Sequence, residues 1–198
     1  MIARVAPEMV RYELGPLLAM ARTFGRSPSQ AEGLRLALAQ AMALTQAPAG
    51  LIQVVRGDRL HLGVQMGLSP RLVEEFRELP ETLIVQVTEG TWKELVPFSL
   101  DSETIPSRAL ALLRPEVTSG LILPLRAGGP TRGILILLSH SRDPLTPGDP
   151  HLLVALGRWV GLTLERAALE EEVHRQSAEI EILTRQIRDL TASHSDPP

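Results

Sequence analysis

The sequence predicts an α+β domain that consists of an antiparallel sheet with helices on one side and continues into a coiled-coil helix. Three observations predict it. Pairs of strand-like apolar runs are joined by short turns that contain glycine, which indicates antiparallel pairing. Segments with helical periodicity precede and follow these runs. The last forty-odd residues carry a heptad repeat, which is typical of a helix that pairs with another helix.

Composition narrows the function classes. The chain has 198 residues, 44% hydrophobic and 22% charged, which suits one domain with a helical extension. The net charge is −3 and the arginines are dispersed, so we expect no nucleic acid partner. The longest aliphatic run, Ile134–Leu138, is far too short to span a bilayer, and the charged first fifteen residues do not resemble a signal peptide. We therefore expect a cytoplasmic protein with no membrane contact.

Two helices are expected first. Met9–Phe24 reads as a helix interrupted at Gly15-Pro16, followed by a loop, so that residues 1–28 precede the main domain. Ser29 and Glu32 form a capping box that starts the next helix. Because the residue before a proline avoids the helical conformation, this helix should stop at Ala47-Pro48.

A hairpin and a short helix come next. Leu51–Arg56 and Leu60–Met66 are strand-like and flank the turn signal Gly57-Asp58. Strand alternation predicts that four apolar side chains of the second strand share one face: Leu60, Leu62, Val64 and Met66. The other face then carries His61, Gly63 and Gln65. Ser69 followed by Pro70 predicts a capped helix that ends near Leu79.

The centre of the sheet is expected later in the chain. Leu83–Val87 and Leu95–Phe98 read as strands within an irregular region. Leu121–Arg126 and Gly133–Ser139 are apolar at nearly every position and are joined by the turn residues 127–130. We therefore expect the last two runs to be central strands covered on both faces.

The final segment predicts one long helix with two parts. Thr146 is the expected cap, with Pro147 at the first helical position. Up to Leu164 the apolar residues have the spacing of a helix packed on a core. From Arg166 they follow a strict heptad whose two seam positions hold Val173, Ile180 and Ile187, and Leu169, Leu183 and Leu190. Branched residues at the first position with leucine at the second favour a parallel two-stranded coiled coil.

These elements divide the chain into four parts. We expect an N-terminal helix and loop at 1–28, a domain at 29–165, a coiled-coil extension at 166–192 and a disordered tail at 193–198. The heptad segment has an alternative, a solvated helix that folds back on its own domain. Intermolecular pairing is favoured, because four heptads contain only two polar seam residues, Arg166 and Gln176.

Five segments in order resemble the GAF domain family. Gly120–Arg126 (GLILPLR) is similar to the family's strand ending in Val-Pro-Leu, and Arg132–Leu138 (RGILILL) to the strand that follows it. Leu145–Leu156 resembles the entry to the family's last helix. Gly67–Val73 and Gln86–Gly90 resemble the segments after its second strand and before its Pro-Val strand. The resemblance covers about residues 31–168.

The resemblance implies a PAS-like fold with an antiparallel sheet of five or six strands, flanking helices and a possible small-ligand pocket. Members of the family bind cyclic nucleotides, tetrapyrroles or other small molecules, or mediate dimers beside an output domain. The absence of cysteine excludes a covalently attached bilin and the family's methionine sulfoxide reductases. The absence of asparagine means that the Asn-Lys-Phe-Asp-Glu set of the phosphodiesterase domains cannot be intact.

Three residues are candidates for a ligand pocket. His61 could point into the pocket as a haem ligand or hydrogen-bond donor, although a half-exposed strand histidine is the simpler interpretation. Trp92 and Phe98 could stack on a planar ligand, although closing the core is favoured. For His140 and His151, which flank a loop with acidic residues, a solvated loop is favoured over a metal site. No catalytic constellation can be singled out.

The sequence thus predicts a non-enzymatic sensory or regulatory domain that forms a homodimer through its C-terminal helix. A small-molecule ligand and a signalling-protein partner are both compatible with it, and the identity of neither is indicated. The alternative, from a different class, is a ligand-free dimerisation or adaptor module for a partner protein.

Overall fold

The fold is seen in a computed structural model, which describes residues 29–57, 59–77, 95–99, 117–141 and 145–194. Five strands and three helices lie within these ranges. In chain order they are α2 (Gln30–Thr45), β1 (Ala49–Arg56), β2 (Arg59–Met66), α3 (Pro70–Glu75), β3 (Val96–Ser99), β4 (Ser119–Leu125), β5 (Gly133–Ser139) and α6 (Pro150–His194). The expected segments at 1–28 and 83–87 lie outside the described residues, as does the tail from 195 onward.

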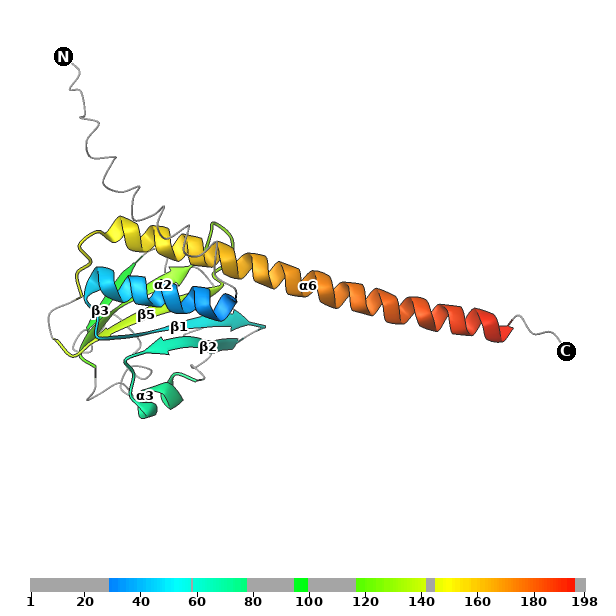
Figure 1. Ribbon diagram of the computed structural model, residues 1–198, viewed down its shortest axis with the longest axis horizontal. Coiled ribbons are helices and arrows are strands. Elements are labelled where there is room, and N and C mark those ends of the chain that lie inside the picture. Colours follow the sequence, from blue (N-terminus) through cyan, green and yellow to red (C-terminus); the bar gives the residue numbers. More distant parts are fainter. Residues whose placement is uncertain (1–28, 58, 78–94, 100–116, 142–144, 195–198) are drawn as a thin grey trace, which may run out of the picture.

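The sheet is antiparallel throughout, in the order β2-β1-β5-β4-β3. Helices α2 and α6 lie side by side across one face (Figure 1), and their apolar side chains join those of the sheet in one core. Helix α3 packs on the opposite face, where Leu72 and Phe76 belong to a second core. We call these the helix face and the α3 face of the sheet.

The two predicted central strands are confirmed. Every residue of β4 and of β5 is buried, and β5 lies in the middle of the sheet. Continuous apolar sequence produces this arrangement because alternate side chains enter the two cores, so that neither face can be polar. Leu121, Leu123 and Leu125 face the helices, whereas Ile122 faces α3.

The predicted alternation along β2 is wrong. The pairing runs from Ile52↔Val64 to Gln53↔Leu62, so that Gly63 is an extra residue in a bulge. A bulge reverses the alternation of side chains on its two sides. Leu60 and Leu62 therefore pack in the α3-face core, whereas Val64 and Met66 pack in the helix-face core.

The caps of α2 and α3 are confirmed. Ser29 Oγ accepts a hydrogen bond from Glu32 N at 3.3 Å, and Ser69 Oγ accepts one from Leu72 N at 3.2 Å, directly before Pro70. Helix α2 ends where Gln46 adopts a left-handed conformation with φ of 56°, just before the predicted stop. Helix α3 is shorter than expected and ends at Glu75.

The predicted start of the long helix is wrong by three residues. Helix α6 begins at Pro150, and Asp149 caps it: Oδ1 accepts hydrogen bonds from His151 N at 2.9 Å and Leu152 N at 3.4 Å. The physical reason is Pro150, which disfavours the helical conformation at Asp149. The helix therefore cannot extend back to Pro147, and the aspartate takes the capping position.

Helix α6 is continuous over 45 residues and projects far beyond the sheet (Figure 1). At 1.5 Å per residue it is about 67 Å long. Its first part lies on β4, where Gly161 approaches the backbone of Arg126 so closely that an added Cβ would lie 2.4 Å from Arg126 N. Among the described residues, none of the helices combines the length and the apolar character that a membrane span requires.

Candidate functional site

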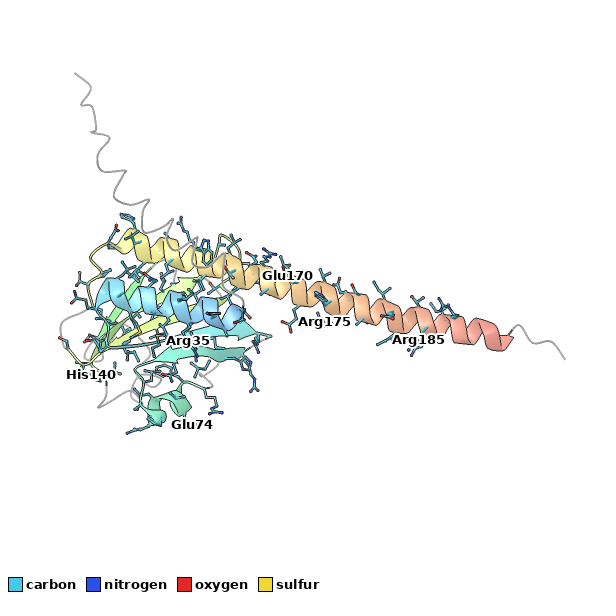
Figure 2. All side chains as sticks on the ribbon, viewed as in Figure 1. Arg35, Glu74, His140, Glu170, Arg175 and Arg185 are labelled. Carbon is cyan, nitrogen blue, oxygen red and sulfur yellow. The ribbon has the colours of Figure 1, made fainter. Side chains whose placement is uncertain are left out.

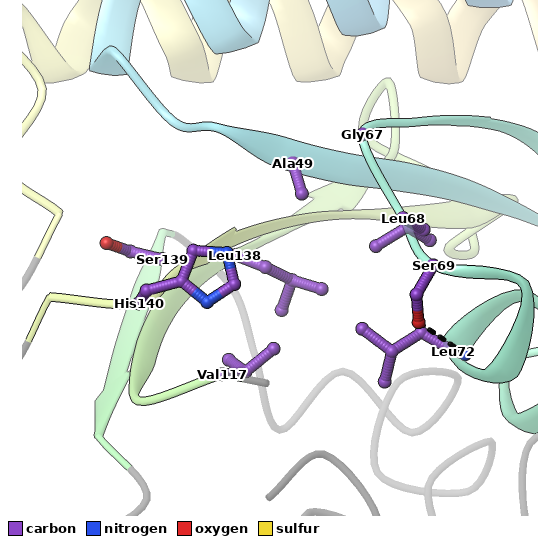
Figure 3. A pocket seen from close by; sticks show the side chains of 9 residues that line it. All are labelled: Ala49, Gly67, Leu68, Ser69, Leu72, Val117, Leu138, Ser139 and His140. Atoms are coloured by element: carbon purple, nitrogen blue, oxygen red, sulfur yellow. Dashed lines mark hydrogen bonds between the residues drawn. The ribbon is translucent and has the colours of Figure 1, made fainter. Parts of the chain in front are cut away.

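A cavity of about 360 Å³ opens on the α3 face, between the ends of β1 and β5 and the start of α3 (Figure 3). Gly67, whose φ of 71° turns the chain between β2 and α3, lies at its edge. Most of its walls are apolar, from Ala49, Leu68, Leu72, Val117 and Leu138. A largely apolar cavity of this size with a few polar groups suits a small organic molecule.

The polar groups of the cavity are Ser69, Ser139 and His140. Two of them are already engaged within the fold, since Ser69 Oγ caps α3 and Ser139 Oγ accepts a hydrogen bond from Ser141 N at 3.0 Å. His140 is exposed, and its ring lies across the cavity from Ser69 (Figure 3). The imidazole is therefore the side chain best placed to hydrogen-bond with a molecule in the cavity.

Gln53 adds a polar group at the centre of the α3 face. Its side chain is fully buried in β1, beside Ile134 of β5. Nε2 donates a hydrogen bond to the carbonyl oxygen of Phe76 at 2.6 Å, whereas Oε1 has no hydrogen-bond partner among the residues that the structure describes. The Gln53 amide thus links the end of α3 to the sheet through a hydrogen bond, while its Oε1 acceptor lies in apolar surroundings.

Sequence reasoning missed Gln53. The available signal was a single amide inside the otherwise apolar run Leu51–Val55. A buried polar side chain is usually hydrogen-bonded, so an amide at such a position indicates a specific partner across the core.

The structure does not bring the three predicted pocket residues together. His61 pairs with Val54, a residue of the helix-face core, and so lies on the face opposite the cavity. Phe98 is 2% exposed and packs on Gly120, where an added Cβ would lie 2.5 Å from its ring. Trp92 lies outside the described residues. Phe98 thus fills the α3-face core, and neither it nor His61 lines the cavity.

No cluster of three or more histidine, aspartate or glutamate side chains that could hold a metal ion occurs within the described part of the chain. His151 lies in the first turn of α6, where its backbone N–H is engaged by Asp149. Asp143, the acidic neighbour of His140, lies outside the described residues.

The second candidate site is the seam of α6 beyond the domain. Its apolar side chains are exposed to the degree expected of surface lysines rather than of leucines. The exposed fractions are 57% for Leu169, 60% for Val173, 63% for Ile180, 50% for Leu183 and 63% for Ile187. The side chain of Leu190 lies outside the described residues. The sheet therefore covers none of these five positions.

Charged side chains, among them Glu170, Arg175 and Arg185, project from the same part of α6 (Figure 2). Arg166 Nε lies 2.7 Å from Glu170 Oε1, and this hydrogen bond, together with the negative charge, raises the pKa of Arg166 above its ordinary value. Glu172 accepts a hydrogen bond from Gln176 Nε2 at 2.7 Å and also pairs with Arg175. Pairs at this spacing favour the helical conformation of a solvent-exposed segment.

No protein-family model and no curated protein sequence matches the chain. Solved structures do match. One is the GAF domain described as that of a sensor histidine kinase from Pseudomonas syringae pv. tomato, with a TM-score of 0.60 and 18% identity over 85% of this chain and 96% of that one. Another is the GAF domain of the Acinetobacter phosphoenolpyruvate-protein phosphotransferase, with a TM-score of 0.62 and 16% identity over 81% and 98%.

A third match is the GAF domain/HD domain protein from Geobacter sulfurreducens, with a TM-score of 0.56 and 14% identity over 71% of this chain and 95% of that one. Each of these solved chains is covered almost completely by the match. Identities this low carry information about architecture alone. The strand order, the two-faced core and these matches agree that the chain has the fold of a GAF domain.

Proposed function

We propose that this chain is a non-enzymatic regulatory or sensory domain that forms a parallel homodimer through α6. The observation that carries the proposal is the exposed apolar seam of α6, from Leu169 to Ile187. An isolated helix of this kind is marginal in water, because most helical stability comes from burying an apolar face. Pairing with a second copy buries that face.

The matched structures support the regulatory part. Their names place the GAF domains in a sensor histidine kinase and in a phosphoenolpyruvate-protein phosphotransferase, which are proteins that contain further domains. By analogy, a coiled coil leaving the domain would connect this chain to an output partner. A fold by itself does not determine a function. The proposal therefore rests more on the exposed seam of α6 than on the analogy with these proteins.

The cavity on the α3 face supports a ligand-responsive role. A molecule held there would contact Leu138 of β5 and Leu72 of α3, while α6 packs on the other face of the same sheet. Binding that favours one position of the sheet relative to α6 would shift the population of coiled-coil states. Native mass spectrometry of the purified protein, with a thermal-shift screen of nucleotides and tetrapyrroles, tests this role.

The dimer is tested by placing a charge in the seam. Ile180→Glu and Leu183→Glu each put a carboxylate where two copies would meet, so we expect folded monomers in sedimentation equilibrium. Ile182→Glu is the matched control. The exposed fractions of Ile182 (60%) and Ile180 (63%) are similar, but Ile182 lies outside the two seam positions. The control should remain dimeric. Seam variants that stay dimeric would place the interface elsewhere.

One observation favours the second candidate, a ligand-free dimerisation or adaptor module. Phe98, which the sequence suggested as a stacking surface for a planar ligand, instead fills the space above Gly120 in the α3-face core, so that the protein's own side chain occupies that position. If neither a co-purified molecule nor a stabilising compound is found while the dimer persists, this second function is the correct one.

A further inference from the structure

A groove on the helix face of the sheet carries a concentration of positive charge. It has a volume of about 840 Å³ and lies in the corner between α6 and the end of β4, where no residue of α2 borders it. Three basic side chains border the groove, Arg126, Arg158 and His151, and none of the described residues around it is acidic. Its walls also include apolar side chains of both elements: Leu123, Val154 and Ala155.

The close packing of α6 on the sheet places Arg126 beside Arg158. Gly161 lies so near the backbone of Arg126 that an added Cβ would be 2.6 Å from its Cα. Arg158 comes three residues before Gly161, which is less than one turn of the helix. The two guanidinium groups therefore reach the same end of the groove from its two walls. His151 precedes Arg158 by seven residues, on the same side of α6 and about 10 Å away along its axis.

The other arginines around α6 have carboxylate partners, which distinguishes them from the arginines of the groove. Glu165, seven residues after Arg158, lies beside Arg132 and does not border the groove. Within the part of the chain that the structure describes, neither Arg126 nor Arg158 forms an ion pair. A groove lined by charge of one sign attracts the opposite sign. The partnered arginines form three pairs: Arg132–Glu165, Arg166–Glu170 and Arg175–Glu172.

We propose that this groove binds a soluble phosphate monoester with a partly apolar body. Such a phosphate carries a charge between about −1.5 and −2 at pH 7, which matches two guanidinium groups better than a single carboxylate does. The planar fork of arginine also donates paired N–H groups to phosphate oxygens. In this arrangement Arg126 and Arg158 hold the phosphate, Val154 and Ala155 contact the organic body, and His151 hydrogen-bonds with a polar group at its far end.

The size of the groove and the charge of the chain favour a soluble molecule over a lipid head group in a membrane. A volume of about 840 Å³ falls within the range of about 300–1,000 Å³ that is usual for small-molecule sites. The net charge of −3 gives the chain no general attraction to an acidic membrane. The site lies on the face of the sheet opposite the α3-face cavity and consists of residues of one chain. It therefore does not depend on the proposed dimer.

Isothermal titration calorimetry of the full-length chain with 1-naphthyl phosphate tests the proposal. Two matched probes separate the parts of the ligand. 1-Naphthalenesulfonate keeps the ring with a single negative charge, and inorganic phosphate keeps the charge without the ring. We expect saturable binding of 1-naphthyl phosphate and weaker binding of both other probes. Absence of binding, or equal affinity for the phosphate and the sulfonate, would contradict the proposed phosphate contacts.

Substitutions locate the binding in the groove. Arg158→Gln and Arg126→Gln each remove one guanidinium group, and Arg185→Gln is the matched control, because Arg185 is an exposed residue of α6 far beyond the domain (Figure 2). We expect each groove variant to weaken binding by about tenfold, the effect of losing a hydrogen bond to a charged group, and the control to bind as the wild type does. Equal losses in all three would indicate general charge attraction and overturn the proposal. Circular dichroism confirms the folding of each variant.

Vesicles that contain phosphatidic acid distinguish the two sources of the phosphate, since the head group of this lipid is also a phosphate monoester. The wild-type chain should remain in the supernatant when the vesicles are sedimented. Co-sedimentation that Arg158→Gln abolishes and Arg185→Gln preserves would overturn the assignment to a soluble molecule.

Discussion

At the scale of single residues, the close approach of α6 to the sheet depends on Gly161. An added Cβ would lie 2.4 to 2.6 Å from three backbone atoms of Arg126, and backbone atoms cannot yield as a flexible side chain can. We expect Gly161→Ala to lower the free energy of unfolding by about 1–3 kcal/mol, the usual cost of overpacking, despite the better helix propensity of alanine.

Gly148 provides the control for this substitution. A Cβ added there would meet nothing within 4 Å, and its backbone conformation is open to other residues. Gly148→Ala should therefore change the free energy of unfolding by less than about 0.5 kcal/mol in the same denaturant titration. Equal effects of the two variants would mean that Gly161 does not touch the backbone of Arg126.

Gln53 gives a prediction that depends on pH. Its side chain is fully buried, so Gln53→Glu places a carboxyl group in apolar surroundings where the charged form is disfavoured. The folded-state pKa of the new carboxyl group should rise above its unfolded value of about 4.3, so the loss of stability is small at pH 4 and grows as the pH increases toward 7.

The measurement is the difference in unfolding free energy from the wild type at each pH, which removes the titration of all other groups. Gln40→Glu is the matched control, because Gln40 is exposed on α2. It should shift stability by less than about 0.5 kcal/mol at every pH. A pH-independent loss for Gln53→Glu would show that the position is solvated.

At the scale of secondary-structure elements, the start of α6 depends on one carboxylate. Asp149 Oδ1 accepts hydrogen bonds from two of the first backbone N–H groups of the helix. We expect Asp149→Ala to cost about 1 kcal/mol of stability, whereas Asp149→Asn should cost much less because asparagine also caps helices well. Chemical denaturation compares the two variants. Similar losses for both would mean that the capping bond contributes little.

Some elements follow directly from local sequence and others do not. Ser29, Ser69 and Pro70 start helices where expected, since a cap needs only residues close in sequence. The bulge at Gly63 was not predictable in the same way, because it depends on the register between two strands. Consequently the positions of His61 and of four apolar side chains on the two faces could not be read from alternation alone.

At the scale of the whole molecule, dimerisation should stabilise the part of α6 beyond the domain, residues 166–192, which we call the stalk. A stalk whose seam residues are 50% to 63% exposed has little tertiary packing of its own. We expect the melting temperature followed by helical circular dichroism to rise with protein concentration in the wild type, because association stabilises the folded state by mass action.

The monomeric variant should behave differently. Ile180→Glu should lose the concentration dependence, and part of its helical signal should disappear at lower temperature than the sheet, since an unpaired stalk is marginal in water. Ile182→Glu should retain the behaviour of the wild type. A melting temperature independent of concentration in the wild type would contradict the proposed dimer.

The sequence by itself determined the sheet's central strands, the caps of α2 and α3 and the heptad of α6, because each depends on the local order of apolar, polar and turn residues. Tertiary structure alone decided where Gly63 reverses the strand, that Gln53 reaches Phe76, and that His61 lies away from the cavity. It also decided which of two adjacent leucines at the start of α6 is buried, since Leu153 packs in the core whereas Leu152 is only half-buried. Spacing along a chain specifies which residues share a face, whereas contacts between distant segments decide what that face meets.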